Sequence, residues 1–163
     1  MELGVEIEPY EDSRLEEIVR LSLRAWEPVF LSIEGALDAD VYQAFYPNGW
    51  RVAQQSAVEA ACSDEDTKVW VAVADARTVG FAALKRHTED NMGEIHMIAV
   101  DLDYQRRGVA TALMNHALDW FRQIGASVAM VETGGDPGHE PARLAYASVG
   151  FRLFPVARYF KKL

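Results

Sequence analysis

The stretch from Gly93 to Gly125 restricts the possible folds most, because its hydrophobic period changes in the middle. Its first part alternates as a β-strand does and becomes apolar on both sides by Val100. After a polar turn at residues 101–104, apolar side chains recur along one face of a helix that ends at Gly125. These apolar positions are Ala110, Leu113, Met114, Ala117, Trp120, Phe121 and Ile124. The stretch therefore predicts a strand, a tight turn and a helix in succession.

The turn at Gln105–Ala110 predicts a site for an anion. The first N–H groups of a helix have no partner within it, and a glycine lets a ligand approach the backbone. Arg106 and Arg107 add positive charge beside Gly108. No Gly-x-x-x-x-Gly-Lys-Ser/Thr run exists, and the glycines of residues 134–138 lack the spacing of a dinucleotide fingerprint. We therefore expect a phosphate-bearing ligand at this turn.

Length, charge and cysteine content narrow the class of protein. The 163 residues fit one domain, 1–163, and no apolar run is long enough to cross a membrane. A net charge of −9 argues against a nucleic-acid partner. The acidic N-terminus lacks the pattern of a signal peptide, and Cys62 is the only cysteine, which together favour a reducing cytoplasm.

The charge is spread unevenly along the chain. Residues 1–100 carry 8 basic and 19 acidic side chains, whereas residues 101–163 carry 8 and 6. An acidic half beside a mildly basic half could favour a cationic substrate next to an anionic cofactor, although an acidic solvated surface explains the same pattern.

The remaining elements follow from periodicity and from turn residues. Asp12 or Ser13 is expected to cap the first helix, and Glu16 would complete a capping box with Ser13. Pro155 is expected to separate two closing strands. The expected helices are residues 13–26, 38–45, 50–61 and 140–149. The expected strands are residues 5–9, 68–74, 79–85, 127–132, 151–154 and 156–160. The pattern predicts an α/β (α+β) protein of one domain.

Two separate motifs give the chain a family resemblance. Gln105, Gly108 and Ala110 match the acetyl-CoA motif Gln/Arg-x-x-Gly-x-Gly/Ala. The run Ala142–Phe151 matches Ala-x-x-x-Tyr-x-x-x-Gly-Phe. The chain thus resembles the GNAT N-acetyltransferase superfamily over nearly its whole length, and its closing run is similar to that of some bacterial members. The resemblance implies a mixed, mostly antiparallel central sheet flanked by helices.

The same resemblance implies acetyl-CoA as cosubstrate and an amine as acceptor, with direct attack in a ternary complex. The identity of the acceptor, a small amine or a protein amino group, stays open. Whether the chain forms a homodimer also stays open. A CoA-binding sensor without catalysis is the alternative. Many relatives carry an Asn that contacts the cofactor, and here that position is His139. His139 either takes over this polar contact or is only a surface turn residue. The other implied cofactor contacts are Ile98, Ala99, Val100, Gln105, Arg106, Arg107, Gly108, Val109, Ala110 and Thr111.

Glu94 and Tyr146 are the implied catalytic residues. An amine acceptor is mostly protonated at neutral pH, so a base must remove a proton before the amine attacks a thioester. Strict alternation would place Glu94 on the strand face of Ile98 and Val100. In family members with a general base on this strand, the base occupies the matching position. Glu132 and His96 are competing bases. Tyr146, on the inner face of its helix, would assist the departing CoA thiolate.

The sequence indicates no metal site. The histidines His87, His96, His116 and His139 lack the spacing of metal ligands. Cys62 has no basic neighbour that would activate its thiol as a nucleophile.

Overall fold

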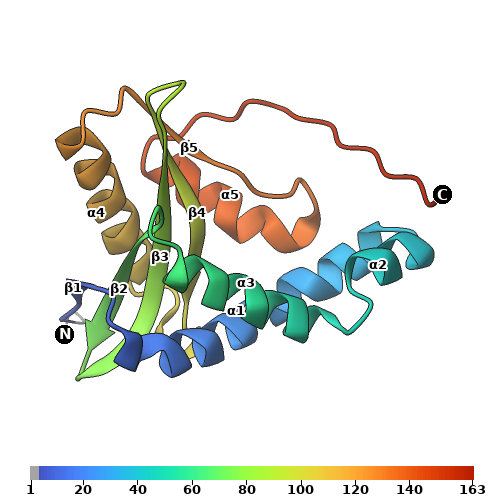
Figure 1. Ribbon diagram of the computed structural model, residues 1–163, viewed down its shortest axis with the longest axis horizontal. Helices are drawn as coiled ribbons and strands as arrows, with labels where there is room; N and C mark the ends of the chain where they lie inside the picture. Colours follow the sequence, from blue (N-terminus) through green and yellow to red (C-terminus); the bar gives the residue numbers. More distant parts are fainter. Residues whose placement is uncertain (1–3) are drawn as a thin grey trace.

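A computed structural model describes residues 4–163 of the chain. Five strands form one sheet in the order β1-β2-β3-β4-β5, and only the β4–β5 pair is parallel (Figure 1). This mostly antiparallel sheet flanked by helices confirms the expected fold class. The strands are β1 (Glu6–Pro9), β2 (Lys68–Ala74), β3 (Arg77–His87), β4 (Met92–Val100) and β5 (Val128–Val131). The α-helices are α1 (Leu15–Ala36), α2 (Ala39–Phe45), α3 (Trp50–Ser63), α4 (Val109–Gln123) and α5 (Glu140–Ser148).

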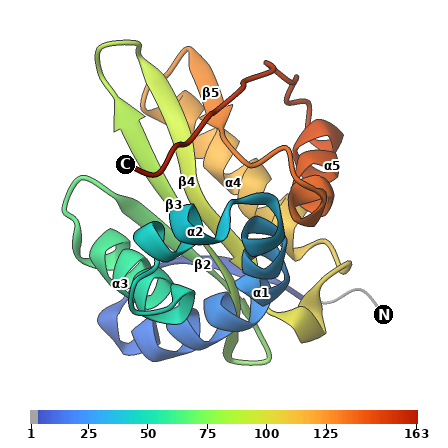
Figure 2. The same cartoon turned by 90° about the vertical axis from the view of Figure 1, so that its right-hand side faces the viewer.

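The sheet separates two apolar clusters. One is formed with α4 and contains Leu84, Ile95 and Phe121, and part of α5 packs against it. The other is formed with α1 and α3 and contains Ile18, Val58 and other buried residues. Helices α1 and α3 lie on the opposite side of the sheet from α4 (Figures 1 and 2). Among residues 4–163, no helix is long and apolar enough to cross a membrane.

Helix α1 differs from its prediction at both ends. It continues through Pro28 to Ala36, because Phe30 is buried and stacks on Trp50 with ring centroids 4.6 Å apart. Tertiary packing therefore offsets the loss of the backbone hydrogen bond that proline cannot donate. The expected capping box at Ser13 and Glu16 is wrong, since a 3-10 turn (Asp12–Arg14) precedes the helix and no side chain caps it.

A β-bulge in β4 changes which face Glu94 occupies. Ala83 pairs with Met97 and the next residue, Leu84, pairs with Ile95, so His96 is an extra residue in β4. Ile95, Ile98 and Val100 all pack on the α4 side. The expectation that Glu94 shares the face of Ile98 and Val100 is therefore wrong, because one inserted residue inverts the alternation. Glu94 lies on the face covered by α1 and α3.

The two closing strands are also wrong. Residues 151–163, called the C-terminal segment below, contain no strand. The segment leaves α5 and runs as an extended chain toward α2 (Figure 1). Its sequence alternates as a strand does, but a strand forms only where a second strand supplies hydrogen-bond partners, and β5 pairs with β4 alone.

Candidate active site

The turn at residues 105–111, called the cradle below, has the geometry of an anion site. Arg106 and Gly108 have φ of +64° and +84°, which turns the chain sharply into α4. No side chain caps the first turn of α4. The N–H groups of Val109 to Thr111 therefore lack an intrahelical or capping partner and point out of the helix start. A Cβ built on Gly108 meets nothing within 4 Å, so the space above it is open.

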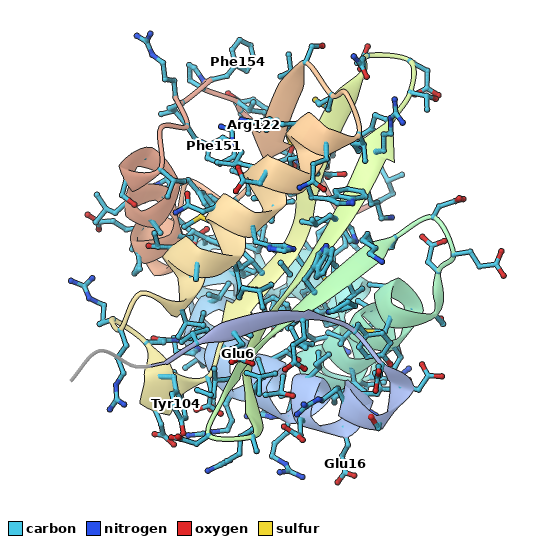
Figure 3. The ribbon with its side chains drawn as sticks, turned by 90° about the vertical axis from the view of Figure 1, so that its left-hand side faces the viewer. Glu6, Glu16, Tyr104, Arg122, Phe151 and Phe154 are labelled. Carbon is cyan, nitrogen blue, oxygen red and sulfur yellow. The ribbon has the colours of Figure 1, made fainter. Side chains whose placement is uncertain are left out.

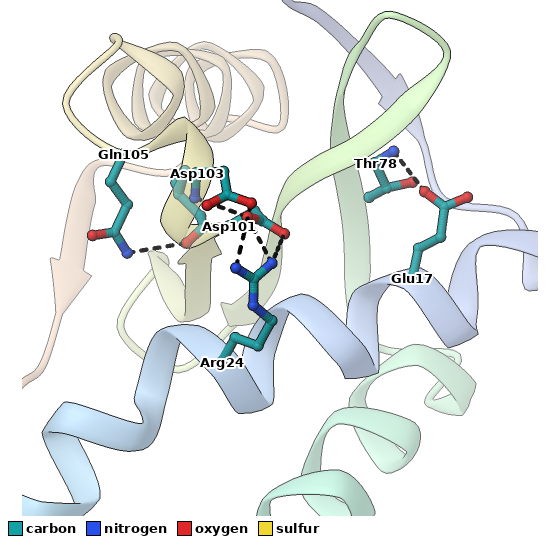
Figure 4. Close-up of polar contacts among 7 residues, drawn as sticks. Glu17, Arg24, Thr78, Asp101, Asp103 and Gln105 are labelled. Atoms are coloured by element: carbon teal, nitrogen blue, oxygen red, sulfur yellow. Dashed lines mark hydrogen bonds and ion pairs between the residues drawn. The ribbon is translucent and has the colours of Figure 1, made fainter.

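Arg24 of α1 holds the turn that precedes the cradle, and Gln105 holds the cradle itself (Figure 4). Arg24 of α1 donates to both carboxylate oxygens of Asp101, at 3.0 and 3.1 Å, and reaches Asp103 at 3.4 Å. Asp101 in turn accepts from the N–H of Asp103. Gln105 donates to the carbonyl oxygen of Val100 at 3.1 Å. Its side chain therefore fixes the turn to the end of β4 in this structure.

The β4 edge that leads into the cradle has no strand partner. β5 pairs with β4 only from Met92 to Ile95. From His96 to Val100, the edge facing β5 is therefore free of any strand among residues 4–163. A free edge can accept an extended ligand as an added strand does. The free edge and the cradle are continuous and contain every cofactor contact expected from the sequence except His139.

Glu94 lies at the base of that edge and is held by one partner. Its Oε2 is 2.8 Å from Nε2 of His87, the last residue of β3, and its side chain is 18% exposed. The carboxylate is thus oriented and still reachable from solvent, as a base must be.

The two competing bases have different surroundings. Glu132 is exposed and pairs with Arg158 of the C-terminal segment at 2.9 Å. His96 occupies the bulge, where burial, and to a smaller extent Lys85, lowers the pKa of its ring. His96 is therefore neutral near pH 7 and able to accept a proton, but the bulge sets it apart from the regular pairing of β4.

Tyr146 lies on the inner face of α5, as expected. Its ring packs against the α4-side cluster and meets Phe151 edge to face, with centroids 6.2 Å apart. Burial raises the pKa of Tyr146 to about 12. The hydroxyl therefore stays protonated at neutral pH and is able to donate a hydrogen bond.

His139 belongs to a polar cluster that joins α1 to the loop after β5. The Ser32 hydroxyl donates to Asp136 at 2.5 Å and accepts from the N–H of Gly138 at 2.9 Å. The other carboxylate oxygen of Asp136 bonds Nδ1 of His139. Burial alone would raise the pKa of Asp136, but the hydrogen bonds from Ser32 and His139 outweigh it and lower that pKa. We call Ser32, Asp136 and His139 the clasp.

The clasp also constrains the residues around it. A Cβ on Gly138 would lie 2.4 Å from Ser32, and one on Gly134 would lie 2.3 Å from Asp136. Arg143 donates to the carbonyl oxygens of Gly134 and Asp136 at 2.6 and 2.9 Å, which ties the loop to α5. The two glycines are thus required by close packing. Their spacing in the sequence suggested only a loop.

Sequence reasoning missed Arg24, Ser32, Asp136 and Arg143. Arg24, Ser32 and Asp136 act through partners far along the chain, and Ser32 and Asp136 are 104 residues apart. Arg143 acts through loop carbonyls seven and nine residues before it, which no side-chain pattern marks. The one available signal was the concentration of glycines at residues 134–138. Among residues 4–163, no group of three or more His, Cys, Asp or Glu side chains could hold a metal ion.

Comparison with known proteins agrees with this geometry. The profile of the Acetyltransferase (GNAT) family matches residues 39–151. The chain belongs to the GNAT acetyltransferase family. The matched region includes the cradle, β4, β5, α5 and part of the α1-side cluster.

The chain is also similar to individual acetyltransferases and to solved structures. It is 27% identical over 156 residues to a mycothiol acetyltransferase from Thermomonospora curvata, covering 91% of this chain and 50% of that protein. It is 34% identical over 83 residues to human N-acetylaspartate synthetase, covering 51% of this chain and 27% of that protein. The chain thus spans half or less of these relatives. The aminoglycoside N-acetyltransferase AAC(6')-Iy in complex with CoA has the same fold, with a TM-score of 0.69, 18% identity and coverage of 99% and 97%.

Proposed function

We propose that this chain transfers an acetyl group from acetyl-CoA to a primary amine by direct attack in a ternary complex. The observation that carries the proposal is the free β4 edge at His96–Val100, which runs directly into the cradle. A solved structure of the same fold contains CoA. CoA has an extended pantetheine arm ending in a pyrophosphate, and these two parts match an edge followed by an anion site.

In this proposal the pantetheine pairs with the backbone of Ile98 to Val100. The pyrophosphate accepts hydrogen bonds from the N–H groups of the cradle, and the exposed Arg106 and Arg107 supply charge. Gln105 supports the turn from within. His139 uses Nδ1 in the clasp, so only Nε2 is available for a contact with the cofactor or the acceptor.

Glu94 removes a proton from the bound amine, directly or through water. The amine nitrogen then attacks the thioester carbon, the C–S bond breaks as the N–C bond forms, and the second proton of the attacking nitrogen ends on the sulfur, which leaves as the free CoA thiol. Tyr146 donates a hydrogen bond to the sulfur that leaves. A pKa of about 12 lies above the ordinary range of a thiol, so hydrogen bonding to the thiolate is favoured over full proton transfer.

The acceptor proposed here is a small cationic amine. Glu94 faces the α1 side of the sheet, where exposed acidic side chains lie on α1, on α2 and at the residue that precedes α2, although Glu27 among them pairs with Arg51. Such charges raise the local concentration of a cation. One solved structure of this fold is an aminoglycoside N-acetyltransferase, an enzyme that acts on an amine. The acidic residues are Glu27, Glu34, Asp38 and Asp40.

The test is release of free CoA thiol in the presence of a panel of amines: a polyamine, an aminoglycoside and a short peptide with a free amino group. We expect turnover with at least one small cation and a product that carries one acetyl group by mass spectrometry. Tight CoA binding without turnover on any amine would instead indicate a CoA-binding module. Absence of CoA binding by calorimetry would contradict the proposal altogether.

A further inference from the structure

The proposed reaction leaves one proton without a carrier. A protonated amine loses its first proton to Glu94, and the attacking nitrogen still has to transfer a second proton to the departing sulfur. Glu94 is protonated by then. Tyr146 holds its own proton tightly, because burial raises its pKa to about 12. A further group that both accepts and donates a proton is therefore needed between the nitrogen and the sulfur.

The bond between Asp136 and His139 prepares the ring of His139 to accept a proton. The hydroxyl of Ser32 donates to one carboxylate oxygen of Asp136, and the other oxygen bonds Nδ1 of the ring. Because the pKa of Asp136 is lowered, its carboxyl group is ionised and acts only as an acceptor. Nδ1 therefore carries the hydrogen, and in the neutral ring the lone pair is on Nε2. A carboxylate placed in this way also stabilises the imidazolium that forms when Nε2 takes a proton.

Nε2 of His139 is open to a ligand. Among residues 4–163, Nε1 of Trp70 is the one buried side-chain nitrogen or oxygen without a hydrogen-bond partner. Nε2 of His139 makes no hydrogen bond either, so it must reach solvent, although the side chain is only 17% exposed. The hydroxyl of Tyr146 is accessible for the same reason. Both side chains are thus mostly enclosed by protein, and their polar atoms are accessible.

The clasp lies across from the free edge of β4. β4 and β5 separate after the pair of Ile95 and Val131, and the chain from residue 132 onward leaves the sheet and reaches α1 at Ser32 (Figure 2). The two sides of this divergence are the β4 edge proposed for the pantetheine and the loop that ends at His139. A thioester at the end of the pantetheine therefore lies between them.

His139 and Tyr146 leave α5 on about the same side. His139 is the residue before α5, and Tyr146 follows seven residues later. Seven residues are nearly two helical turns, or about 10 Å along the axis, so the two side chains point in a similar direction. The ring of Tyr146 is held by Phe151, which lies beside α4 (Figure 3). The two accessible polar atoms therefore lie along one side of α5.

We propose that His139 is a catalytic residue that carries the second proton from the attacking nitrogen to the sulfur of CoA, a role that rests on the proposed acetyl transfer. Nε2 takes the proton as the N–C bond forms, and the ring becomes an imidazolium beside Asp136. The same proton passes to the sulfur as the C–S bond breaks. The ring ends neutral and the thiol leaves uncharged, so this step neither gains nor loses a proton. Asp136 and Ser32 are positioning residues, because they act through the ring.

The first test does not depend on activity. Two-bond proton–nitrogen correlation spectra of the full chain, recorded above neutral pH, show which ring nitrogen carries hydrogen. The signals of His139 are identified by their loss in His139→Asn. We expect hydrogen on Nδ1 alone. Asp136→Asn should abolish this preference, whereas Asp119→Asn, which removes a carboxylate that pairs with Arg122 on α4, should leave it intact. Hydrogen on Nε2 in the wild type, alone or together with Nδ1, would overturn the proposal.

The second test separates a proton carrier from a cofactor contact. His139→Asn introduces the residue that many relatives carry, which keeps a polar group but cannot carry a proton. With an accepted amine, kcat should fall about 10²-fold with KM for acetyl-CoA nearly unchanged, and added imidazole should restore part of kcat. His116→Asn is the matched control, because His116 packs on Trp70 and takes no part in the clasp. Its kcat should stay near that of the wild type, with or without imidazole.

The outcomes distinguish this role from the acetyl transfer itself. A normal kcat in His139→Asn, or a raised KM for acetyl-CoA with kcat unchanged, would overturn the proposal while the wild type remains an acetyltransferase. If the wild type acetylates no amine, the proposed function fails, and the role of His139 fails with it, whatever hydrogen its ring carries.

Discussion

The cradle comes from one continuous stretch of chain, whereas the clasp joins residues 104 positions apart. The cradle's turn, its glycine and its helix start are adjacent in sequence, so backbone geometry alone creates the proposed anion site. The clasp exists only because α1 and the loop after β5 meet in space. The contrast teaches that the cradle, proposed for the pyrophosphate, is set by local backbone geometry, whereas the clasp, which orients His139, is set by packing.

The strongest test of the cradle is Gly108→Glu. A side chain at φ +84° strains the turn, and a carboxylate above the helix start repels a pyrophosphate. We expect acetyl-CoA affinity to fall by about 100-fold or more, measured by calorimetry. Gly125→Glu is the matched control, because Gly125 has φ +79° and the same open surroundings at the other end of α4. Equal losses in both variants would remove the cradle from the proposal.

The second largest effect is expected for Glu94→Gln, which keeps the shape of the side chain and removes the proton acceptor. At neutral pH kcat should fall about 10²-fold with acetyl-CoA affinity unchanged, and activity should recover in part at high pH as the amine loses its own proton. The comparison variant is Glu132→Gln. If only that variant shows this profile, the base is Glu132 and the bulge at His96 has no catalytic consequence.

A smaller effect is expected for Tyr146→Phe, which removes a hydroxyl but keeps the ring against Phe151. If the hydroxyl stabilises the thiolate, kcat should fall about 10-fold with little change in KM for acetyl-CoA. With an acyl donor whose leaving thiol is more acidic, steady-state kinetics should show a smaller decrease in kcat. Lowered melting temperature with normal turnover would mean that Tyr146 serves packing only.

The pKa of Tyr146 adds a test of stability. A folded-state pKa of about 12 lies above the unfolded value of about 10, so the folded state holds this proton more tightly. The resulting stabilisation is fully present below pH 10 and is lost as pH rises toward 12. Urea titrations should give a lower free energy of unfolding at pH 11 than at pH 9, and this decrease should be smaller in Tyr146→Phe. An identical loss in both proteins would assign the alkaline transition to other groups.

The smallest effect on the reaction is expected for Ser32→Ala, which breaks the clasp on the α1 side. The free energy of unfolding should drop by about 1 kcal/mol, as for one lost hydrogen bond. If Nε2 of His139 contacts the acceptor, KM for the amine should rise several-fold with acetyl-CoA affinity unchanged; if it contacts the cofactor, acetyl-CoA affinity should fall instead. Ser148→Ala is a suitable control, since Ser148 bonds only a carbonyl within its own helix.

The sequence by itself determined the strand–turn–helix at residues 93–125, the hairpin of β2 and β3, the cradle and the position of Tyr146. These features depend on neighbours within a few residues, where periodicity and glycine act directly. Tertiary structure decided the rest. The extension of α1 through Pro28 depends on stacking with Trp50, the face of Glu94 on one extra residue at His96, and the clasp on the meeting of two distant segments. The C-terminal segment has the pattern of a strand, but a strand requires hydrogen-bond partners that no local pattern can supply.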